Sequence, residues 1–287
     1  MPEHMEGPLS LVAGVAIEVR DAEEARGFYE PIFGARGAWE PRGDAVIFRT
    51  AEQSVELVVN TSPRTLPDSG QHQAYGVDAA MLPGLLAQLQ RSGCVSEWWR
   101  EDHPMERAPC TYVLDPSGNR VQLVASSDAG LLIDHVALNV HDMPHARSFY
   151  TQVLGGMVDY AHGRDMDHYA EAKAYLEGDD PCAPWTRYVV ESRSHGRPGT
   201  TFKPVSRPAM QLFLGIGPTR LGLMLGEHDY QEPPEEHVRG TPCVTLRSAA
   251  GFGPTLSRLS ASAPTFVQEY PSLFLRDPSG NFLEIAC

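Results

Sequence analysis

The sequence has little of several features that would assign it to a specialised class of protein. It contains five cysteines, an odd number, and none of them belongs to a Cys-x-x-Cys pair. This pattern is typical of reduced thiols in a cytoplasm rather than of a disulfide framework. No apolar run approaches the ~20 residues of a membrane span, and residues 1–6 lack the basic segment and apolar core of a secretory signal. We therefore expect a cytoplasmic protein without a membrane partner.

Positive charge is also scarce. Lys and Arg together number 23 against 37 Asp and Glu, which gives a formal net charge of −14. Because such a chain has little to neutralise a run of phosphates, we expect no nucleic-acid partner. The hydrophobic content of 42% is that of an ordinary globular protein. The length of 287 residues predicts about two domains.

One turn motif occurs twice, near the end of each half of the sequence. Asp-Pro-Ser-Gly-Asn stands at 115–119 and again at 277–281, each time between apolar segments. Pro fixes φ and Gly accepts a positive φ, as a tight reversal between antiparallel strands requires. Both stretches are therefore predicted to be hairpins. In the strand that follows, Gln122 of the first copy takes the place of Glu284 in the second, so only one copy keeps the charge.

The repetition extends along the whole chain. Phe28 and Gly34, near the end of one predicted helix, correspond to Phe149 and Gly155 in another. The offset is 121 residues in both cases (149 − 28 and 155 − 34). Each helix follows an alternating apolar segment and precedes further apolar segments. The order strand, helix, strand, strand, strand is therefore predicted to occur four times.

These four units divide into two halves. Residues 126–130 are predicted to be the linker between an N-terminal domain at 1–126 and a C-terminal domain at 132–287. In the first unit of each half, an aspartate precedes the predicted helix. We expect Asp21 and Asp142 to cap these helices, because a carboxylate can accept hydrogen bonds from the first free backbone N–H groups.

Four such βαβββ modules, a helix ending in Phe-Tyr-x-x-x-φ-Gly and hairpins followed by a glutamate resemble the vicinal oxygen chelate superfamily. That superfamily includes glyoxalase I, bleomycin-resistance proteins and type I extradiol dioxygenases. The resemblance implies an α+β fold of two tandem glyoxalase-like domains, in which two modules curl round a divalent metal ion. With a degenerate first half, the chain looks most like an extradiol dioxygenase, in which only the second half binds iron.

The resemblance also marks metal ligands. The first histidine of the superfamily falls on His135 and the glutamate falls on Glu284, whereas Cys243 stands at the place of the second histidine. Phe274 replaces a tyrosine of the dioxygenases and is a candidate substrate contact. The third ligand is left open between three residues, which are Cys243, His228 and His237. The metal is expected to be Fe(II) or Zn(II), because imidazole and carboxylate ligands suit both and a thiolate suits zinc.

The residues themselves support these roles unequally. Glu284 lies among apolar neighbours, where a carboxylate is costly unless it is paired, protonated or bound to a metal. His135 begins a strand, where a structural histidine is the ordinary alternative to a ligand. A buried cysteine such as Cys243 behaves in most proteins as a small hydrophobe. In the first half the ligand places hold Gly14 and Gln122, so no metal site is expected there.

Residues 161–208 have no counterpart in the other modules. A segment of this length without a repeat equivalent typically covers a site, so we predict a mobile cover over the cavity of the second half. The candidate acids or bases within it are His162, His168 and His195. The candidate substrate contacts within it are Trp185, Tyr188 and Arg193. The alternative is that this segment packs against the first half or against the second subunit of a homodimer.

Two functions from different classes fit these observations. As a metal-dependent enzyme, the protein would bind vicinal oxygens of a small aromatic or hydroxy-carbonyl substrate and assist ring cleavage, isomerisation or a lyase step. As a metal-free binding protein of the bleomycin-resistance type, it would sequester a small molecule such as an antibiotic. The pairing of His135 with Glu284 favours the enzyme, and the replacements at Cys243 and Phe274 favour the binding protein or a chemistry other than oxygenation.

Overall fold

The structure is a computed structural model of the whole chain. It describes residues 9–43, 45–63, 71–92, 96–98, 110–126, 130–163, 169–170, 173, 210–226, 242–249, 253, 266–269 and 272–286.

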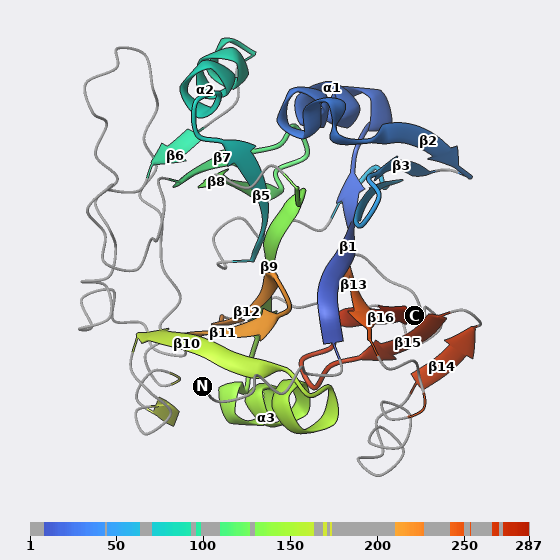
Figure 1. The fold of residues 1–287 in the computed structure, drawn as a ribbon, viewed down its shortest axis with the longest axis vertical. Coiled ribbons are helices and arrows are strands. Elements are labelled where there is room, and N and C mark those ends of the chain that lie inside the picture. Colours follow the sequence, from blue (N-terminus) through green and yellow to red (C-terminus); the bar gives the residue numbers. More distant parts are fainter. Residues whose placement is uncertain are drawn as a thin grey trace.

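The described residues form four modules, with helices at the top and bottom and strands between them (Figure 1). The first module contains β1 (Leu9–Val19), α1 (Ala22–Phe33), η1 (Gly34–Arg36), β2 (Ala38–Arg42), β3 (Ala45–Arg49) and β4 (Ser54–Val59). The second contains β5 (His72–Asp78), α2 (Leu82–Arg91), β6 (Ser96–Trp98), β7 (Cys110–Leu114) and β8 (Arg120–Ser126). The third contains β9 (Ile133–Val140), α3 (Met143–Ser148), η2 (Phe149–Val153), β10 (Met157–Gly163), β11 (Met210–Ile216) and β12 (Thr219–Leu225). The fourth contains β13 (Cys243–Ser248), β14 (Phe266–Glu269), β15 (Ser272–Arg276) and β16 (Phe282–Ala286).

The predicted helix starts are confirmed. The side chain of Asp21 accepts a hydrogen bond from the backbone N–H of Glu24, and Asp142 accepts one from His145 in the same way. Each carboxylate thus satisfies a backbone donor that the first turn of a helix leaves free. Gly34 ends α1 with a φ of 58°, a conformation that glycine adopts without steric cost. The α+β class and the four modules are likewise as predicted.

The modules pair into two sheets, but they do not pair within the halves of the sequence. Sheet A joins the first and fourth modules in the order β14-β15-β16-β13-β1-β4-β3-β2. Sheet B joins the second and third modules in the order β10-β11-β12-β9-β5-β8-β7-β6. The antiparallel pairs β1 with β13 and β5 with β9 form the two centres (Figure 1). Each sheet therefore takes strands from both 1–126 and 132–287, and neither sheet follows the predicted domain boundary.

Within each half of the sequence, the Asp-Pro-Ser-Gly-Asn turn joins the two modules of that half. Asp115 accepts a hydrogen bond of 3.0 Å from the hydroxyl of Tyr29, and Asp277 accepts one of 2.9 Å from Tyr150. Burial raises the pKa of both aspartates, although the hydrogen bonds that they accept act in the opposite direction. Each turn thus fixes the end of one module to the helix of the module before it.

A buried glutamine joins sheet A to sheet B. The amide nitrogen of Gln53 donates to the backbone oxygens of Val12 and Ile133, at 2.9 and 3.1 Å. Its amide oxygen accepts from the backbone N–H groups of Leu132 and Ile133, at 2.7 and 2.8 Å. Because Val12 belongs to β1 and Ile133 begins β9, one side chain bridges the central strands of the two sheets. Its four contacts satisfy backbone groups that burial would otherwise make costly.

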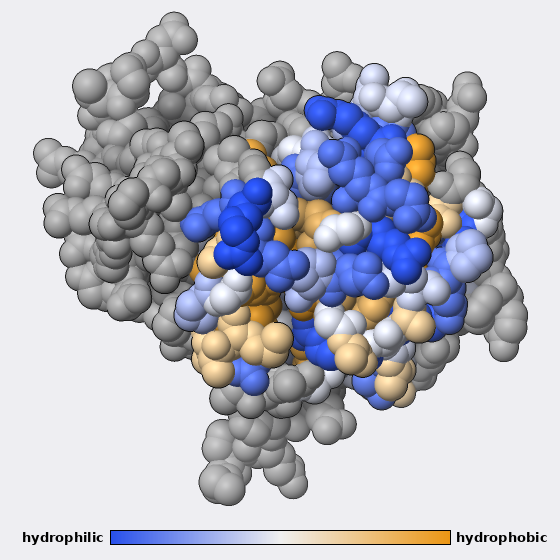
Figure 2. All heavy atoms as spheres, turned by 90° about the horizontal axis from the view of Figure 1, so that it is seen from above, coloured by the Kyte–Doolittle hydropathy of each residue, from blue (hydrophilic) through white to orange (hydrophobic). Residues whose placement is uncertain are grey.

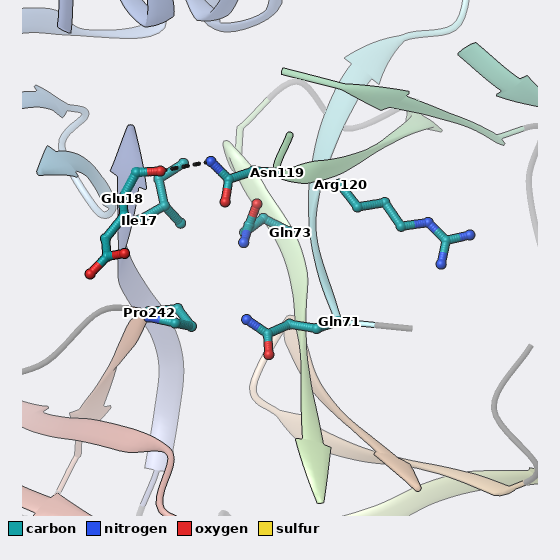
Figure 3. Close-up of a pocket in the computed structure, with 7 residues that line it drawn as sticks. All are labelled: Ile17, Glu18, Gln71, Gln73, Asn119, Arg120 and Pro242. Carbon is teal, nitrogen blue, oxygen red and sulfur yellow. Dashed lines mark hydrogen bonds between the residues drawn. The ribbon is translucent and has the colours of Figure 1, made fainter. Parts of the chain in front are cut away.

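A small polar pocket lies between the two sheets. Its volume of about 10 Å³ has room for a single water molecule. Asn119 donates a hydrogen bond of 2.8 Å to the backbone oxygen of Glu18 at its edge (Figure 3). The complete lining is Ile17, Glu18, Gln71, Gln73, Asn119, Arg120 and Pro242. We regard this pocket as a structural water site, because it is too small for an organic ligand.

The surface seen from above, on the side of α1 and α2, is predominantly hydrophilic where the structure describes it, and its hydrophobic residues are scattered (Figure 2). Within the described part of the chain, no helix is both long and apolar enough to cross a membrane.

Candidate functional site

The pairing of strands defines four equivalent positions on one face of each sheet. Residues paired across neighbouring strands share a face, so each row can be followed from strand to strand. In sheet A the row consists of Ser54, Gly14, Thr245 and Glu284. In sheet B the row consists of Arg220, His135, Ala74 and Gln122. The offset of 121 residues places Gly14 and His135 at the same position of the two rows.

These rows correct the expected metal site. His135 lies on β9 in sheet B, whereas Glu284 lies on β16 in sheet A, so the two do not face one another in one cavity. The error arose because the repeat identifies equivalent modules without showing which of them pair. Cys243 lies in sheet A, where it pairs with Ala16, and it lines the same cavity as Glu284. The three residues therefore do not form a common ligand set.

Sheet B brings His135 against a histidine that the sequence analysis missed. His72 on β5 lies two residues from Ala74, the cross-strand partner of His135, and so faces the same side. The Nε2 atoms of His72 and His135 are 3.0 Å apart. Both side chains are almost completely buried, with exposures of 4% and 6%. The alternation of side chains along a strand was the signal in the sequence that could have identified His72.

A carboxylate and a guanidinium orient this pair from one side. Asp134 Oδ2 lies 2.6 Å from Nδ1 of His135 and 3.2 Å from an Nη atom of Arg220. Burial by itself would raise the pKa of Asp134, but His135 and Arg220 outweigh it, and the pKa lies below its ordinary value. An ionised Asp134 favours the tautomer of His135 that carries its proton on Nδ1. The Nε2 lone pair of His135 then points towards His72.

Aromatic rings and an amide surround the two imidazoles. The ring of Tyr112 meets that of His72 edge to face at 5.2 Å, and Phe213 meets His135 in the same way at 5.3 Å. Gln122 is next in the row, and its buried amide oxygen has no hydrogen-bond partner. A buried acceptor without a donor is unfavourable, and the oxygen is thus available to a ligand or an ion. Sheet B therefore combines two imidazole nitrogens with an amide oxygen on one face.

Sheet A has a different chemistry at the equivalent positions. Glu284 accepts hydrogen bonds from the hydroxyls of Thr245 and Ser272, at 2.8 and 2.5 Å. The cavity beside it has a volume of about 280 Å³. Phe274, a predicted substrate contact, pairs with Glu284 across β15 and β16 and is 6% exposed. The sheet A row thus offers one carboxylate and hydroxyls but no imidazole.

Comparison with known proteins identifies the family of this chain. The sequence profile of the Glyoxalase/Bleomycin resistance protein/Dioxygenase superfamily matches residues 132–285, which is more than half of the chain. The chain belongs to this superfamily. No curated protein sequence matches it significantly.

Solved structures of the glyoxalase superfamily share its fold over nearly the full length. A mutant of glyoxalase I from Zea mays superposes with a TM-score of 0.64 at 14% identity, covering 99% of this chain and 95% of that one. A protein from Bacillus subtilis assigned as a dioxygenase gives a TM-score of 0.58 at 11% identity, covering 98% of this chain and 86% of that one. At these identities the likeness establishes the four-module fold and leaves the activity open.

Members of the glyoxalase superfamily are generally metal-dependent, and the two rows fit a metal to different degrees. In sheet B, two imidazole nitrogens and the unsatisfied oxygen of Gln122 form a donor set that suits a divalent transition metal. In sheet A, Gly14 stands where His135 stands in sheet B. A Cβ atom added there would come within 2.9 Å of Ser54 Oγ, so no imidazole fits without a shift. Within the described residues, no group of three or more His, Cys, Asp or Glu side chains is placed to hold a metal ion.

Several predicted site residues lie outside the described part of the chain. His162 occupies β10, where it pairs with Gln211 at the edge of sheet B, but its side chain is not among those described. The remaining predicted residues outside the described ranges are His168, Trp185, Tyr188, Arg193, His195, His228 and His237. The predicted cover at 161–208 falls almost wholly in the same undescribed segment.

Proposed function

We propose that this glyoxalase-superfamily protein is a metal-dependent enzyme whose reactive centre is the His72–His135 pair of sheet B. Its substrate would be a small aromatic or hydroxy-carbonyl compound with two neighbouring oxygen atoms. The observation that carries the proposal is the 3.0 Å approach of two buried Nε2 atoms, with Asp134 holding the far nitrogen of His135. A carboxylate in that position is typical of histidines that bind metals, because it fixes the ring and raises its basicity.

The residues around the pair have separate roles in this proposal. His72 and His135 would hold the metal, with Gln122 as a neutral oxygen ligand, and the metal would supply a Lewis acid for the substrate oxygens. Asp134 fixes the orientation of His135. Arg220 keeps Asp134 ionised, so that His135 keeps its proton on Nδ1 and its Nε2 lone pair free.

The walls favour a flat substrate. Tyr112 and Phe213 present aromatic rings beside the two imidazoles, and ring contacts of this kind suit an aromatic or otherwise planar ligand. The guanidinium of Arg120 lies 4.2 Å from the centre of the Tyr112 ring and adds positive charge at this wall. A catechol or a hydroxy-ketone, which carries partial or full negative charge on its oxygens, fits these surroundings.

Metal content tests the proposed centre directly. Protein purified without chelator should contain about one equivalent of a divalent transition metal. His72→Ala and His135→Ala should each lose it while keeping the melting temperature within a few degrees, whereas Glu284→Gln should keep the metal. Elemental analysis measures the content, and thermal unfolding verifies the fold of each variant. Less than about a tenth of an equivalent in the wild type, or loss of metal in Glu284→Gln alone, would contradict a centre in sheet B.

Oxygen uptake tests the reaction class. The protein, incubated with catechols in air with and without added Fe(II), should consume O₂ or convert the ring to a product that absorbs in the visible range if it cleaves rings. Hydroxy-carbonyl compounds, followed by loss of their carbonyl absorbance, test the isomerase and lyase alternatives. A turnover that survives His135→Ala would place the chemistry elsewhere.

A second candidate function is the metal-free binding of a small molecule, as in a resistance protein. The observation that favours it is the cavity of about 280 Å³ in sheet A, whose row has no imidazole. Tight binding of a small molecule by the metal-depleted protein, without turnover, would favour this function over the enzyme.

A further inference from the structure

The cavity on sheet A is lined by charges of both signs. Three arginines and three glutamates surround it, together with small apolar and hydroxyl side chains. The complete lining is Ala13, Val15, Ala16, Arg42, Ile47, Arg49, Thr50, Ala51, Glu52, Gln53, Ser54, Glu56, Cys243, Thr245, Arg247, Glu284 and Ala286. Its volume of about 280 Å³ is near the lower limit of ordinary ligand sites. The charges therefore decide which compact ligand the cavity can accept.

All three arginines already have carboxylate partners. Arg42 lies 3.2 Å from Glu56, and Arg247 lies 2.5 Å from Glu52. The third arginine, Arg49, lies 3.4 Å from Glu40, which is on β2 outside the cavity. Because each guanidinium is compensated in this way, the arginines offer little attraction to an anionic ligand. The uncompensated charge of the cavity therefore does not belong to an arginine.

Glu284 is the carboxylate of the cavity that has no basic partner within the described structure. Thr245 and Ser272 each donate one hydroxyl to it, one to either oxygen. Each oxygen keeps a further lone pair, and the side chain is partly buried in the cavity wall. A partly buried carboxylate without a basic partner gains stability when a positive charge joins it.

We propose that the sheet A cavity binds a small organic cation, a protonated amine with a compact apolar body, and that Glu284 is its counter-ion. The ammonium group would donate to the two oxygens of Glu284 that face the cavity. Ile47 and the small side chains of Val15 and Ala286 offer an apolar wall for the rest of the molecule. Charge-assisted hydrogen bonds of an ammonium to a carboxylate are about twice as strong as neutral ones. They therefore give a clear preference for the cation.

This site is independent of the centre proposed in sheet B. Glu284 and the His72–His135 pair belong to different sheets, so a failure of one proposal leaves the other standing. The sheet A site also needs no transition metal, because Gly14 and Cys243 stand where sheet B has His135 and His72.

Three probes of similar size separate the charge from the shape of the ligand. Cyclohexylmethylammonium, cyclohexylmethanol and cyclohexanecarboxylate are titrated into the full-length protein in the presence of EDTA, and calorimetry gives each dissociation constant. We expect the amine to bind at least about tenfold more tightly than the alcohol or the carboxylate. Glu284→Gln should abolish this preference. Glu30→Gln, which makes the same charge change on the exposed side of α1, should leave it unaltered, as should His135→Ala.

Every other result overturns the proposal. Equal binding of the three probes, tighter binding of the carboxylate, or no binding of the amine would each remove the role of Glu284 as a counter-ion. Unchanged binding of the amine to Glu284→Gln would have the same consequence. A titration with Mg²⁺ or Ca²⁺ in the absence of EDTA is the remaining arm, and binding of either ion that depends on Glu284 would make this a hard-cation site instead.

Discussion

Sheet A and sheet B have the same architecture, and they differ in the side chains at equivalent positions. At the position where sheet B has His135, sheet A has Gly14, and where sheet B has Gln122, sheet A has Glu284. Sheet B thus has buried nitrogen donors, whereas sheet A has a carboxylate held by hydroxyls. A single metal site would combine the histidine and the carboxylate. In this chain the two lie in different sheets.

This difference shows that position in a repeated fold and chemical role are separate properties. The backbone of each sheet places four side chains in a row on one face regardless of what those side chains are. The row positions therefore identify where a site lies, and only the side chains decide its ligand. Four sets of variants test how the two sheets depend on these side chains.

The largest effect is expected from Gln53→Ala, which removes the bridge between the sheets. Two buried carbonyl groups and two buried N–H groups lose their partners, and we expect a loss of about 4 kcal/mol in the free energy of unfolding. Urea unfolding measures it, with Glu30→Ala, at an exposed position of α1, as the control. A loss below about 1 kcal/mol would mean that the two sheets are joined mainly by other contacts.

The next effect compares the two turn aspartates. Asp277→Asn and Asp115→Asn should each cost about 2–3 kcal/mol, because the new amide group would face hydroxyl and amide donors where a carboxylate accepts. Since both aspartates have the same set of donors, the two losses in urea unfolding should agree within about 1 kcal/mol. A much smaller loss at one site would show that the halves of the sequence are not equally dependent on their turns.

A smaller effect tests why sheet A has no imidazole. Gly14→Ala should cost about 1–2 kcal/mol, because the new Cβ would lie 2.9 Å from Ser54 Oγ and 3.1 Å from the Ser54 backbone oxygen. Adding Ser54→Gly removes the hydroxyl and should return part of the loss, which a double-mutant cycle measures. If Gly14→Ala is neutral, steric exclusion does not explain the missing histidine.

The smallest effect is a change in pH dependence at sheet B. The pKa of Asp134 is lowered in the folded protein, so its contribution to stability is present above its unfolded pKa and is lost as the pH falls through the folded value. The wild type should therefore exceed Asp134→Asn by about 1 kcal/mol or less at pH 6. The two unfolding free energies should converge as the pH falls below about 4, the ordinary pKa of an aspartate. A difference that grows on acidification would contradict the role of His135 and Arg220 in lowering this pKa.

The modules and their turns could be predicted from the sequence, because they depend on local patterns. The offset of 121 residues, the caps at Asp21 and Asp142, and the alternation of apolar residues each belong to a single module. The repetition of these patterns was enough to predict four βαβββ units and the α+β class. The family followed from the same patterns together with the hairpin turns.

The pairing of modules could not be predicted in this way, and the candidate site depended on it. Strands β1, β5, β9 and β13 present similar edges, so the sequence is compatible with more than one partner for each. Assigning His135 and Glu284 to one cavity required the partner that the structure does not use. Cys243 was expected beside His135, but it lies in sheet A at the position that His72 occupies in sheet B, since it pairs with Ala16 as His72 pairs with Ala137. His72 was overlooked because no motif marks it.

The pairing of the first module with the last has a consequence for how the protein is made. All strands of sheet B lie between residues 72 and 225, so they leave the ribosome while the chain is still growing. Sheet A cannot be completed until β13–β16 emerge, because Leu9 pairs with Ser248. Until then β1 is paired with β4 on one side and has an open edge on the other, and such an edge is prone to pair with other chains. A shortage of chaperones during synthesis should therefore harm sheet A before it harms sheet B.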